Sequence, residues 1–109
     1  MVEVLRYVTA SGTDVVGNWL AELRDAQARA RVAARLNRMA AGNFGDCKPL
    51  ASGVWELRVN WGPGYRVYYA MAGHQCVLLL CGGDKRKQAS DIRRAIEHWM
   101  DYQRRTKKR

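Results

Sequence analysis

The chain has 109 residues, 48% of them hydrophobic and only two of them proline, which is enough for one compact domain and too little for two ordinary ones. Nineteen Lys and Arg against ten Asp and Glu leave a formal net charge of +9. We interpret this charge as favouring a nucleic-acid partner; the alternatives are that it serves only solubility or adsorption to anionic membranes. The longest apolar run, Cys76 to Cys81, is too short to cross a bilayer, and Glu3 and Arg6 interrupt the N-terminal stretch where a signal peptide would be apolar. We therefore expect a cytoplasmic protein without a membrane partner.

A strand and two helices are predicted in the first half of the chain. Residues 2–9 are rich in β-branched and aromatic types, which predicts a strand. Ser11 or Thr13 can then cap a helix whose apolar positions recur at helical spacing, namely Val16, Trp19, Leu20 and Leu23. Residues 25–41 are dense in Ala, Arg and Leu, which predicts a second helix. One of its faces carries a stripe of arginines that indicates first a solvated surface and second a surface for RNA or a protein partner: Arg24, Arg31, Arg35 and Arg38.

Three strands and a final helix are predicted in the second half. Residues 54–60 and 65–71 alternate apolar and polar side chains around a Trp-Gly-Pro-Gly turn, and residues 76–81 are apolar on both faces, as in a central strand. Four apolar residues then recur at helical spacing ahead of a basic tail at about 104–109: Ile92, Ala95, Ile96 and Trp99. The order β-α-α-β-β-β-α predicts an α+β domain spanning 1–109, with a small, mostly antiparallel sheet and helices packed on one face.

Two arginines are predicted to share one face of this sheet. Alternation places Arg58 and Arg66 on the side away from Trp55 and Leu57, if the turn keeps the two strands in register. Tyr68 lies on the same side, and Lys85 leaves the next strand through Gly82-Gly83, a pair that lets backbone approach a ligand closely. Cations, an aromatic ring and free amides on one surface suit a single strand of RNA. The alternative is that each arginine simply pairs with a nearby acid such as Glu56, Asp84 or Asp91.

Other chemistries find little support in the sequence. Cys47, Cys76 and Cys81 form no C-x-x-C pair and indicate buried, reduced thiols, and with His74 and His98 they supply no familiar zinc spacing, so no metal site is expected. His74 lies at a predicted hairpin tip, and His98 indicates a packed or surface residue of a helix, so neither is a convincing base. The Gly-Gly-Asp-Lys segment lacks the spacing of a P-loop, which excludes nucleotide hydrolysis.

Two long segments carry a resemblance to a known family. Residues 55–69 (WELRVNWGPGYRVYY) and 77–99 (VLLLCGGDKRKQASDIRRAIEHW), with the length and element order, resemble the RelE/ParE toxin superfamily, specifically its phage Gp49-like, HigB-type branch of addiction-module killer proteins. The resemblance covers nearly the whole chain. It implies a RelE-like fold and the toxin of a type II toxin–antitoxin system, with a cognate helix-turn-helix, HigA-like antitoxin as its partner.

The resemblance also implies an activity. Toxins of the RelE kind cut mRNA on the ribosome through attack of the substrate's own 2′-OH, which leaves a 2′,3′-cyclic phosphate and needs neither metal nor organic cofactor. In this chain Arg66 would stabilise the phosphorane, Arg58 would position the phosphate or promote proton removal, and Lys85 would assist proton transfer. The general acid stays unassigned. Further residues are candidates for RNA binding, the aromatic ones by stacking: Trp61, Tyr68, Asp84, Arg86, Tyr102 and Arg104.

Two other functions remain open. ParE-like relatives inhibit DNA gyrase without any nuclease reaction, and the arginine stripe of the second helix would suit such a binder. A plain RNA-binding module without cleavage is the third hypothesis; its affinity would fall with salt at a log-log slope of about −0.7 per phosphate contact.

Overall fold

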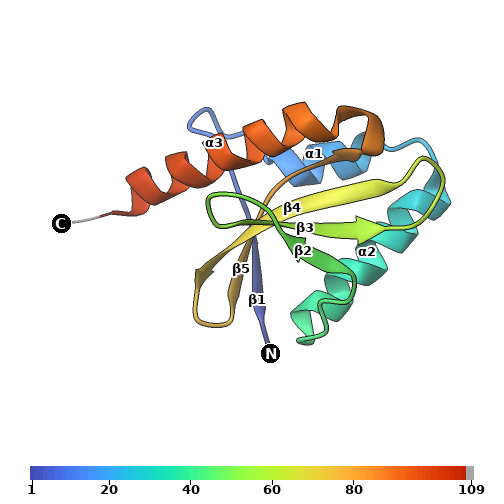
Figure 1. Cartoon of the computed structure of the whole chain (residues 1–109), viewed down its shortest axis with the longest axis horizontal. Helices are drawn as coiled ribbons and strands as arrows, with labels where there is room; N and C mark the ends of the chain where they lie inside the picture. Colours follow the sequence, from blue (N-terminus) through green and yellow to red (C-terminus); the bar gives the residue numbers. More distant parts are fainter. Residues whose placement is uncertain (108–109) are drawn as a thin grey trace.

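A five-stranded sheet with three helices makes up the part of the chain that the structure, a computed structural model, describes: residues 1–107 (Figure 1). The strands are β1 (Glu3–Arg6), β2 (Cys47–Pro49), β3 (Val54–Val59), β4 (Tyr65–Gly73) and β5 (Cys76–Asp84). The helices are α1 (Val15–Glu22), α2 (Ala26–Ala40) and α3 (Gln88–Thr106), with a single 3-10 turn, η1 (Lys85–Lys87), directly before α3. The α+β class and the predicted order are confirmed, with β2 as an addition. Lys108 and Arg109 of the predicted tail lie outside the described residues.

The sheet has the strand order β1-β5-β4-β3-β2, in which β1 runs parallel to β5 and all other neighbours are antiparallel. The turn at residues 60–64 returns the chain so that Arg58 and Arg66 become direct cross-strand partners. The predicted register across this hairpin is therefore confirmed. β2 was not predicted because it has only three residues and ends in Pro49, which an edge strand tolerates.

Helices cover both faces of the sheet, so the prediction that they pack on one face is wrong. Val16 of α1 and Val32 and Met39 of α2 pack on one face, against a cluster that includes Leu57 and Val67. On the opposite face, α3 packs through Ala95 against a second cluster: Tyr7, Val54, Tyr68, Ala70, Leu78, Leu80 and Cys81. The physical reason is that β4 and β5 carry apolar side chains on both faces, and neither face can stay in water.

Aspartates begin the first two helices. The Asp14 carboxylate accepts a hydrogen bond from the Gly17 N–H at 3.1 Å, so α1 is capped by Asp14 and not by Ser11 or Thr13 as predicted. Asp25 caps α2 in the same way through the Gln27 N–H at 2.9 Å. Both caps satisfy backbone N–H groups that a first helical turn leaves free.

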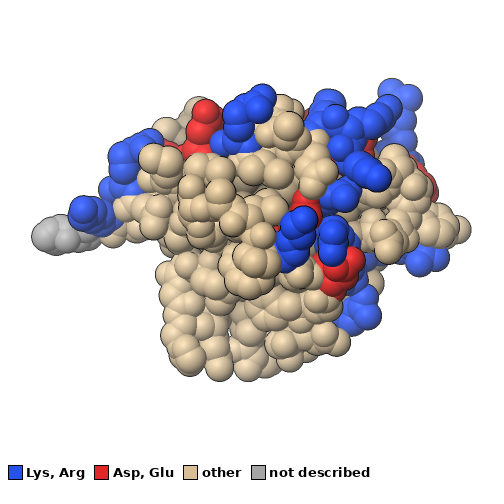
Figure 2. All heavy atoms as spheres, in the orientation of Figure 1, with Lys and Arg blue, Asp and Glu red and all other residues tan. Residues whose placement is uncertain are grey.

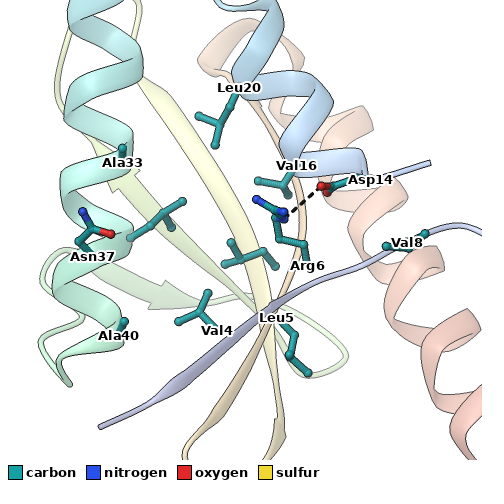
Figure 3. A pocket seen from close by; sticks show the side chains of 12 residues that line it. Val4, Leu5, Arg6, Val8, Asp14, Val16, Leu20, Ala33, Asn37 and Ala40 are labelled. Carbon is teal, nitrogen blue, oxygen red and sulfur yellow. Dashed lines mark ion pairs between the residues drawn. The ribbon is translucent and has the colours of Figure 1, made fainter. Parts of the chain in front are cut away.

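An apolar cavity of about 610 Å³ lies between β1, α1 and α2 (Figure 3). Val4, Val16 and Leu20 point into it, and an ion pair of 3.1 Å joins Arg6 and Asp14 at its edge. The residues that line this cavity are mostly apolar, unlike the residues of the cationic surfaces of the molecule. No helix within residues 1–107 is both long and apolar enough to span a bilayer.

Lys and Arg side chains are unevenly distributed on the surface. Figure 2 shows them along α3 and over the end of the sheet where α3 begins, whereas the end that carries the β4–β5 hairpin is nearly free of charge in this view. On the face seen in Figure 2, cationic side chains would therefore attract a polyanion along α3 and to the end of the sheet where α3 begins.

Candidate functional site

A cavity of about 450 Å³ lies at the cationic end of the sheet, and we call it the cationic cavity. It is lined by residues 58–66, which form the end of β3, the turn and the start of β4, and by Lys85 at the start of η1. All three cations that the sequence singled out, Arg58, Arg66 and Lys85, therefore line one cavity. The Lys85 N–H donates to the Gly64 carbonyl at 2.9 Å, which joins η1 to the β3–β4 turn.

Arg66 is the most firmly held of the three cations. Its Nε donates to Glu56 Oε2 at 3.0 Å, and its side chain is only 13% exposed. The Glu56 side chain is 1% exposed and also accepts a hydrogen bond from Gln88 Nε2 at 2.7 Å. Pairing of Arg66 with Glu56 was one of the alternatives that the sequence left open. Because the bond uses Nε, the terminal nitrogens of the guanidinium remain for a ligand.

Arg58 and Lys85 are held more loosely. Arg58 donates from Nη2 to Asp46 Oδ1 at 3.0 Å, in an ion pair whose side chains are 37% and 46% exposed. Exposed pairs of this kind contribute little to stability and are screened by salt, so a phosphate can replace the carboxylate. Arg35 of α2 donates to the Arg58 carbonyl and fixes the backbone from the other face of the sheet. Lys85 is exposed at the start of η1.

Asp84 and Arg86 belong to the turn beside the cavity and do not line it. The Asp84 carboxylate accepts from the Arg86 N–H at 2.9 Å and pairs with the Arg86 guanidinium at 2.8 Å. The hydrogen bond from Arg86 lowers the pKa of Asp84, so this carboxyl stays charged. Arg86 itself is 80% exposed, which leaves it free to contact a long polyanion.

Trp61 lines the cationic cavity, but one face of its indole is already occupied. Its Nε1 donates to Asp25 Oδ2 at 3.0 Å, and the hydrogen bond lowers the pKa of that carboxyl. The Arg31 guanidinium carbon lies 3.9 Å from the ring centroid, at cation–π distance. The ring also packs against the core cluster that includes Leu57 and Val67, so only its exposed part remains for a base.

Three other predicted RNA-binding residues are not brought to the cavity. The prediction for Tyr68 is wrong, because α3 covers that face of the sheet and leaves the ring 0% exposed, so no base can stack on it. Burial also raises the pKa of the Tyr68 hydroxyl far above its ordinary value. Tyr102 stacks on Trp99 and lines a different cavity further along α3. Arg104 pairs with Asp101 at 3.5 Å, near the end of the same helix.

The glycine pair at the end of β5 serves packing. A Cβ on Gly82 would lie 2.4 Å from the Trp19 ring, and a Cβ on Gly83 would lie 2.0 Å from Asp91 Oδ2. Trp19 and Asp91 thus pack directly against the backbone of β5 at neighbouring positions that carry no side chain. The sequence interpretation, which related these glycines to the approach of a ligand, is replaced by this close packing against side chains of α1 and α3.

The histidines and cysteines lie outside the cationic cavity. His98 stacks on Tyr7 with ring centroids 4.5 Å apart, and burial lowers its pKa, which fits the predicted packed histidine. Cys81 is buried as predicted, and burial raises the pKa of its thiol to about 11, whereas Cys47 and Cys76 are partly exposed. Within the described part of the chain, His, Cys, Asp and Glu form no group of three that could hold a metal ion.

Sequence reasoning missed the groups that hold the cations. Glu56 was considered only as a surface partner, and Gln88 and Asp46 were not considered at all. An acidic residue in an alternating strand ordinarily lies on the face exposed to solvent, so the alternation alone does not indicate that α3 buries Glu56. The hydrogen bond from Gln88 joins positions 32 residues apart and could be found only from the packing of α3.

The sequence of this chain is similar to those of known proteins. The model of the family described as phage-derived protein Gp49-like matches residues 18–99, which run from α1 to α3 and include the whole cationic cavity. A protein of Haemophilus influenzae, described only as an uncharacterized protein, is 46% identical over 78 residues, which are 72% of this chain and 79% of the relative.

Proposed function

This chain belongs to the family of phage-derived Gp49-like proteins, and we propose that it is the toxin of a type II toxin–antitoxin module, a RelE/HigB-like endoribonuclease that cleaves mRNA on the ribosome. One observation carries the proposal: Arg58, Arg66 and Lys85, from three separate segments, line a single cavity. Three cations around one space suit a phosphodiester that gains negative charge as it reacts.

The proposed reaction is a transesterification within the RNA. The 2′-oxygen of the substrate forms a bond to the adjacent phosphorus while the bond from phosphorus to the 5′-oxygen breaks. The proton of the 2′-OH leaves to a base, and the departing 5′-oxygen takes up a proton, so the products are a 2′,3′-cyclic phosphate and a 5′-OH. The protein supplies charge and orientation, and the chemistry uses only groups of the substrate and the chain.

The three cations take different parts in this reaction. Arg66, held through Nε, presents its remaining N–H groups to the equatorial oxygens of the phosphorane. Arg58 exchanges its exposed partner Asp46 for the phosphate and orients it. Lys85, exposed at the end of the cavity, assists proton transfer at the reacting oxygens.

RNA beyond the reacting phosphate would follow the surrounding charge. Arg86 extends from the same turn as Lys85, and the exposed part of the Trp61 ring can contact one base. The net charge of +9 adds a contribution to RNA affinity that depends on salt and not on sequence. Binding to the ribosome, where mRNA is presented as a single strand, is part of the proposal.

The arrangement of α2 supports cleavage over ParE-like inhibition of gyrase. Arg24 of the predicted stripe precedes α2, so three of its arginines lie on the helix. Two of these serve the fold, because Arg31 covers Trp61 and Arg35 donates to the Phe44 carbonyl at 3.1 Å. Arg24 and Arg38 are exposed. Arg31 and Arg35 are thus engaged in contacts within the protein, which leaves Arg24 and Arg38 of the stripe for a partner such as gyrase.

The proposal includes the partner and location that toxins of this kind share. A helix-turn-helix, HigA-like antitoxin would bind the toxin in the cytoplasm and block it. Co-expression with the candidate antitoxin should restore growth to cells that this chain inhibits, and the two proteins should co-purify.

The proposal is tested by primer extension on a defined mRNA in a cell-free translation extract. Wild-type protein should create new 5′ ends in translated message, and Lys85→Ala should lower the cleavage rate by about 10²-fold. Lys85 is exposed, so its loss leaves the fold intact, whereas Arg66→Ala would leave the Glu56 carboxylate buried without its charged partner.

Arg93→Ala is the matched control, since it removes one exposed cation from α3 outside the cavity and should cleave like wild type. Cleavage that persists unchanged in a folded Lys85→Ala/Arg58→Ala protein would refute the assignment. RNA binding without any cut ends would favour a binding module, and inhibited supercoiling with intact mRNA would favour the gyrase inhibitor.

A further inference from the structure

Glu56 is unusual among the residues near the cationic cavity, because it is an acid with 0% exposure in the middle of β3. Its neighbours on that face of the sheet include its cross-strand partner Tyr68 and the apolar side of α3. An apolar side chain of similar size would pack there without the cost of removing a carboxylate from water. The position of a charge at this point therefore calls for a reason beyond stability.

Both hydrogen bonds of Glu56 end on groups that belong to the cavity or its rim. Arg66 Nε and Gln88 Nε2 donate to the same oxygen, Oε2, at 3.0 and 2.7 Å. Within the described residues, the other oxygen, Oε1, is buried and accepts no hydrogen bond. One carboxylate oxygen thus holds the guanidinium of β4 and the first side chain of α3 together.

The bond to Arg66 fixes which nitrogens face the cavity. With Nε bound to Glu56, the plane of the guanidinium has lost its freedom to turn, and Nη1 lies beside Gly64, 3.5 Å from where a Cβ would be. Arg58 is the direct cross-strand neighbour of Arg66, and two guanidiniums side by side repel each other. The Glu56 carboxylate offsets this repulsion at Arg66, as the Asp46 carboxylate does at Arg58.

The bond to Gln88 fixes the turn that carries Lys85. At the start of η1, the Lys85 N–H is bound to the Gly64 carbonyl, and directly after η1, Gln88 is bound to Glu56. The turn is therefore attached at both of its ends to the β3–β4 hairpin. Lys85 and Arg66 come from different segments. The pairing of β4 with β5 and the Lys85–Gly64 bond join these segments through the backbone, and the Glu56 carboxylate joins them through side chains.

We propose that Glu56 is the positioning residue of the cationic cavity, holding the Arg66 guanidinium directly and the Lys85 turn through Gln88. This inference rests on the proposed RNA cleavage for its effect on rate. Its geometric part concerns only the side chains of Arg66, Glu56 and Gln88.

Two variants test the inference in the full-length protein. Glu56→Gln keeps the shape and one acceptor but removes the charge, and Gln88→Ala removes the second donor only. We expect the single-turnover cleavage rate to fall about 10- to 100-fold in Glu56→Gln and by a smaller factor in Gln88→Ala. RNA affinity should change by less than about threefold, since the cations that attract RNA all remain. A structural role alone would lower the melting temperature without separating rate from affinity.

A second readout does not depend on cleavage. In NMR spectra of the arginine Nε–H groups, the Arg66 proton should exchange with water at least about tenfold more slowly than that of the exposed control Arg93, because a hydrogen bond to a charged group contributes about 1.5–3 kcal/mol. This protection should disappear in Glu56→Gln. If Glu56→Gln folds poorly, Gln88→Ala still tests the positioning role, since it releases the Lys85 turn and should lower the cleavage rate while the Arg66 proton stays protected. An unchanged rate in Gln88→Ala would overturn the link from Glu56 to the Lys85 turn.

The outcomes separate the two proposals. Wild-type protein that leaves translated mRNA intact refutes the nuclease function, and equal exchange of the Arg66 and Arg93 protons then overturns the positioning role as well. If the wild type cleaves, a folded Glu56→Gln protein that cuts within about twofold of the wild-type rate overturns the positioning role alone. Slow exchange together with a selective loss of rate supports it.

Discussion

Substitution of Gly82 by Ala should be strongly destabilising, although it adds only one methyl group. The new Cβ would lie 2.4, 2.5 and 2.7 Å from three atoms of the Trp19 ring, all far inside van der Waals contact. The ring is rigid and packs against the core cluster beneath α1, so relief requires a shift of α1 or β5. Overpacking of this kind costs about 1–3 kcal/mol, which corresponds to a fall in melting temperature of about 5–12 °C for a chain of this size.

Gly73→Ala is the matched control, because its Cβ would lie 4.0 Å from that of Cys76, an ordinary contact. Urea unfolding of both variants should show a loss confined to Gly82→Ala. In a double-mutant cycle, Trp19→Ala should remove the clash, so the double variant should lose less stability than the sum of the single losses. Equal stability of the two glycine variants, or strict additivity in the cycle, would show that close packing does not explain the glycine.

Two further predictions concern side chains around the sheet. Asp25→Ala removes both the cap of α2 at the Gln27 N–H and the acceptor of Trp61 Nε1. The free energy of unfolding should therefore fall by about 1–2 kcal/mol, and Trp61 fluorescence should shift. An unchanged urea midpoint would contradict both contacts. Burial lowers the pKa of His98 below its ordinary 6.5, so the unfolded chain binds the proton more readily, and stability should decline as the pH falls below 6.5 towards the folded pKa. His98→Phe, which keeps a ring against Tyr7, should lose this part of the pH dependence of the melting temperature, and an identical profile would refute the assignment.

Much of the fold follows from local patterns in the sequence. The alternation of residues 54–60 and 65–71 places Arg58 and Arg66 on one face, because side chains repeat with a period of two, and the turn at residues 60–64 sets the register that makes them partners. Burial of the face that carries Tyr68 could not be predicted in the same way. It depends on α3 crossing back over the sheet, which is a matter of tertiary packing. The sequence carries only an indirect sign of it, the apolar residues on both faces of β4 and β5.

The candidate site could likewise be predicted only in part from the sequence. Its cations stand out in the sequence because Arg and Lys at strand ends and turns are visible as residue types. The groups that hold them do not: Glu56 in a strand, Gln88 at the start of a helix and Asp46 in a loop look like ordinary surface residues until the chain folds. Reasoning from charge alone therefore finds what would attract a phosphate, and the structure adds what keeps the attracting groups in place.

The chemistry of the cut ends tests the central claim most directly. The protein is added to a translation extract, and EDTA is added once translation has stopped. The recovered mRNA should carry 5′-OH ends, which a polynucleotide kinase labels without prior phosphatase treatment. The matching 3′ ends should carry 2′,3′-cyclic phosphates. Lys85→Ala should abolish most of this labelling, and Arg93→Ala should not. Intact message, or ends that carry a 5′-phosphate, would contradict cleavage by the 2′-oxygen at the cavity of Arg58, Arg66 and Lys85.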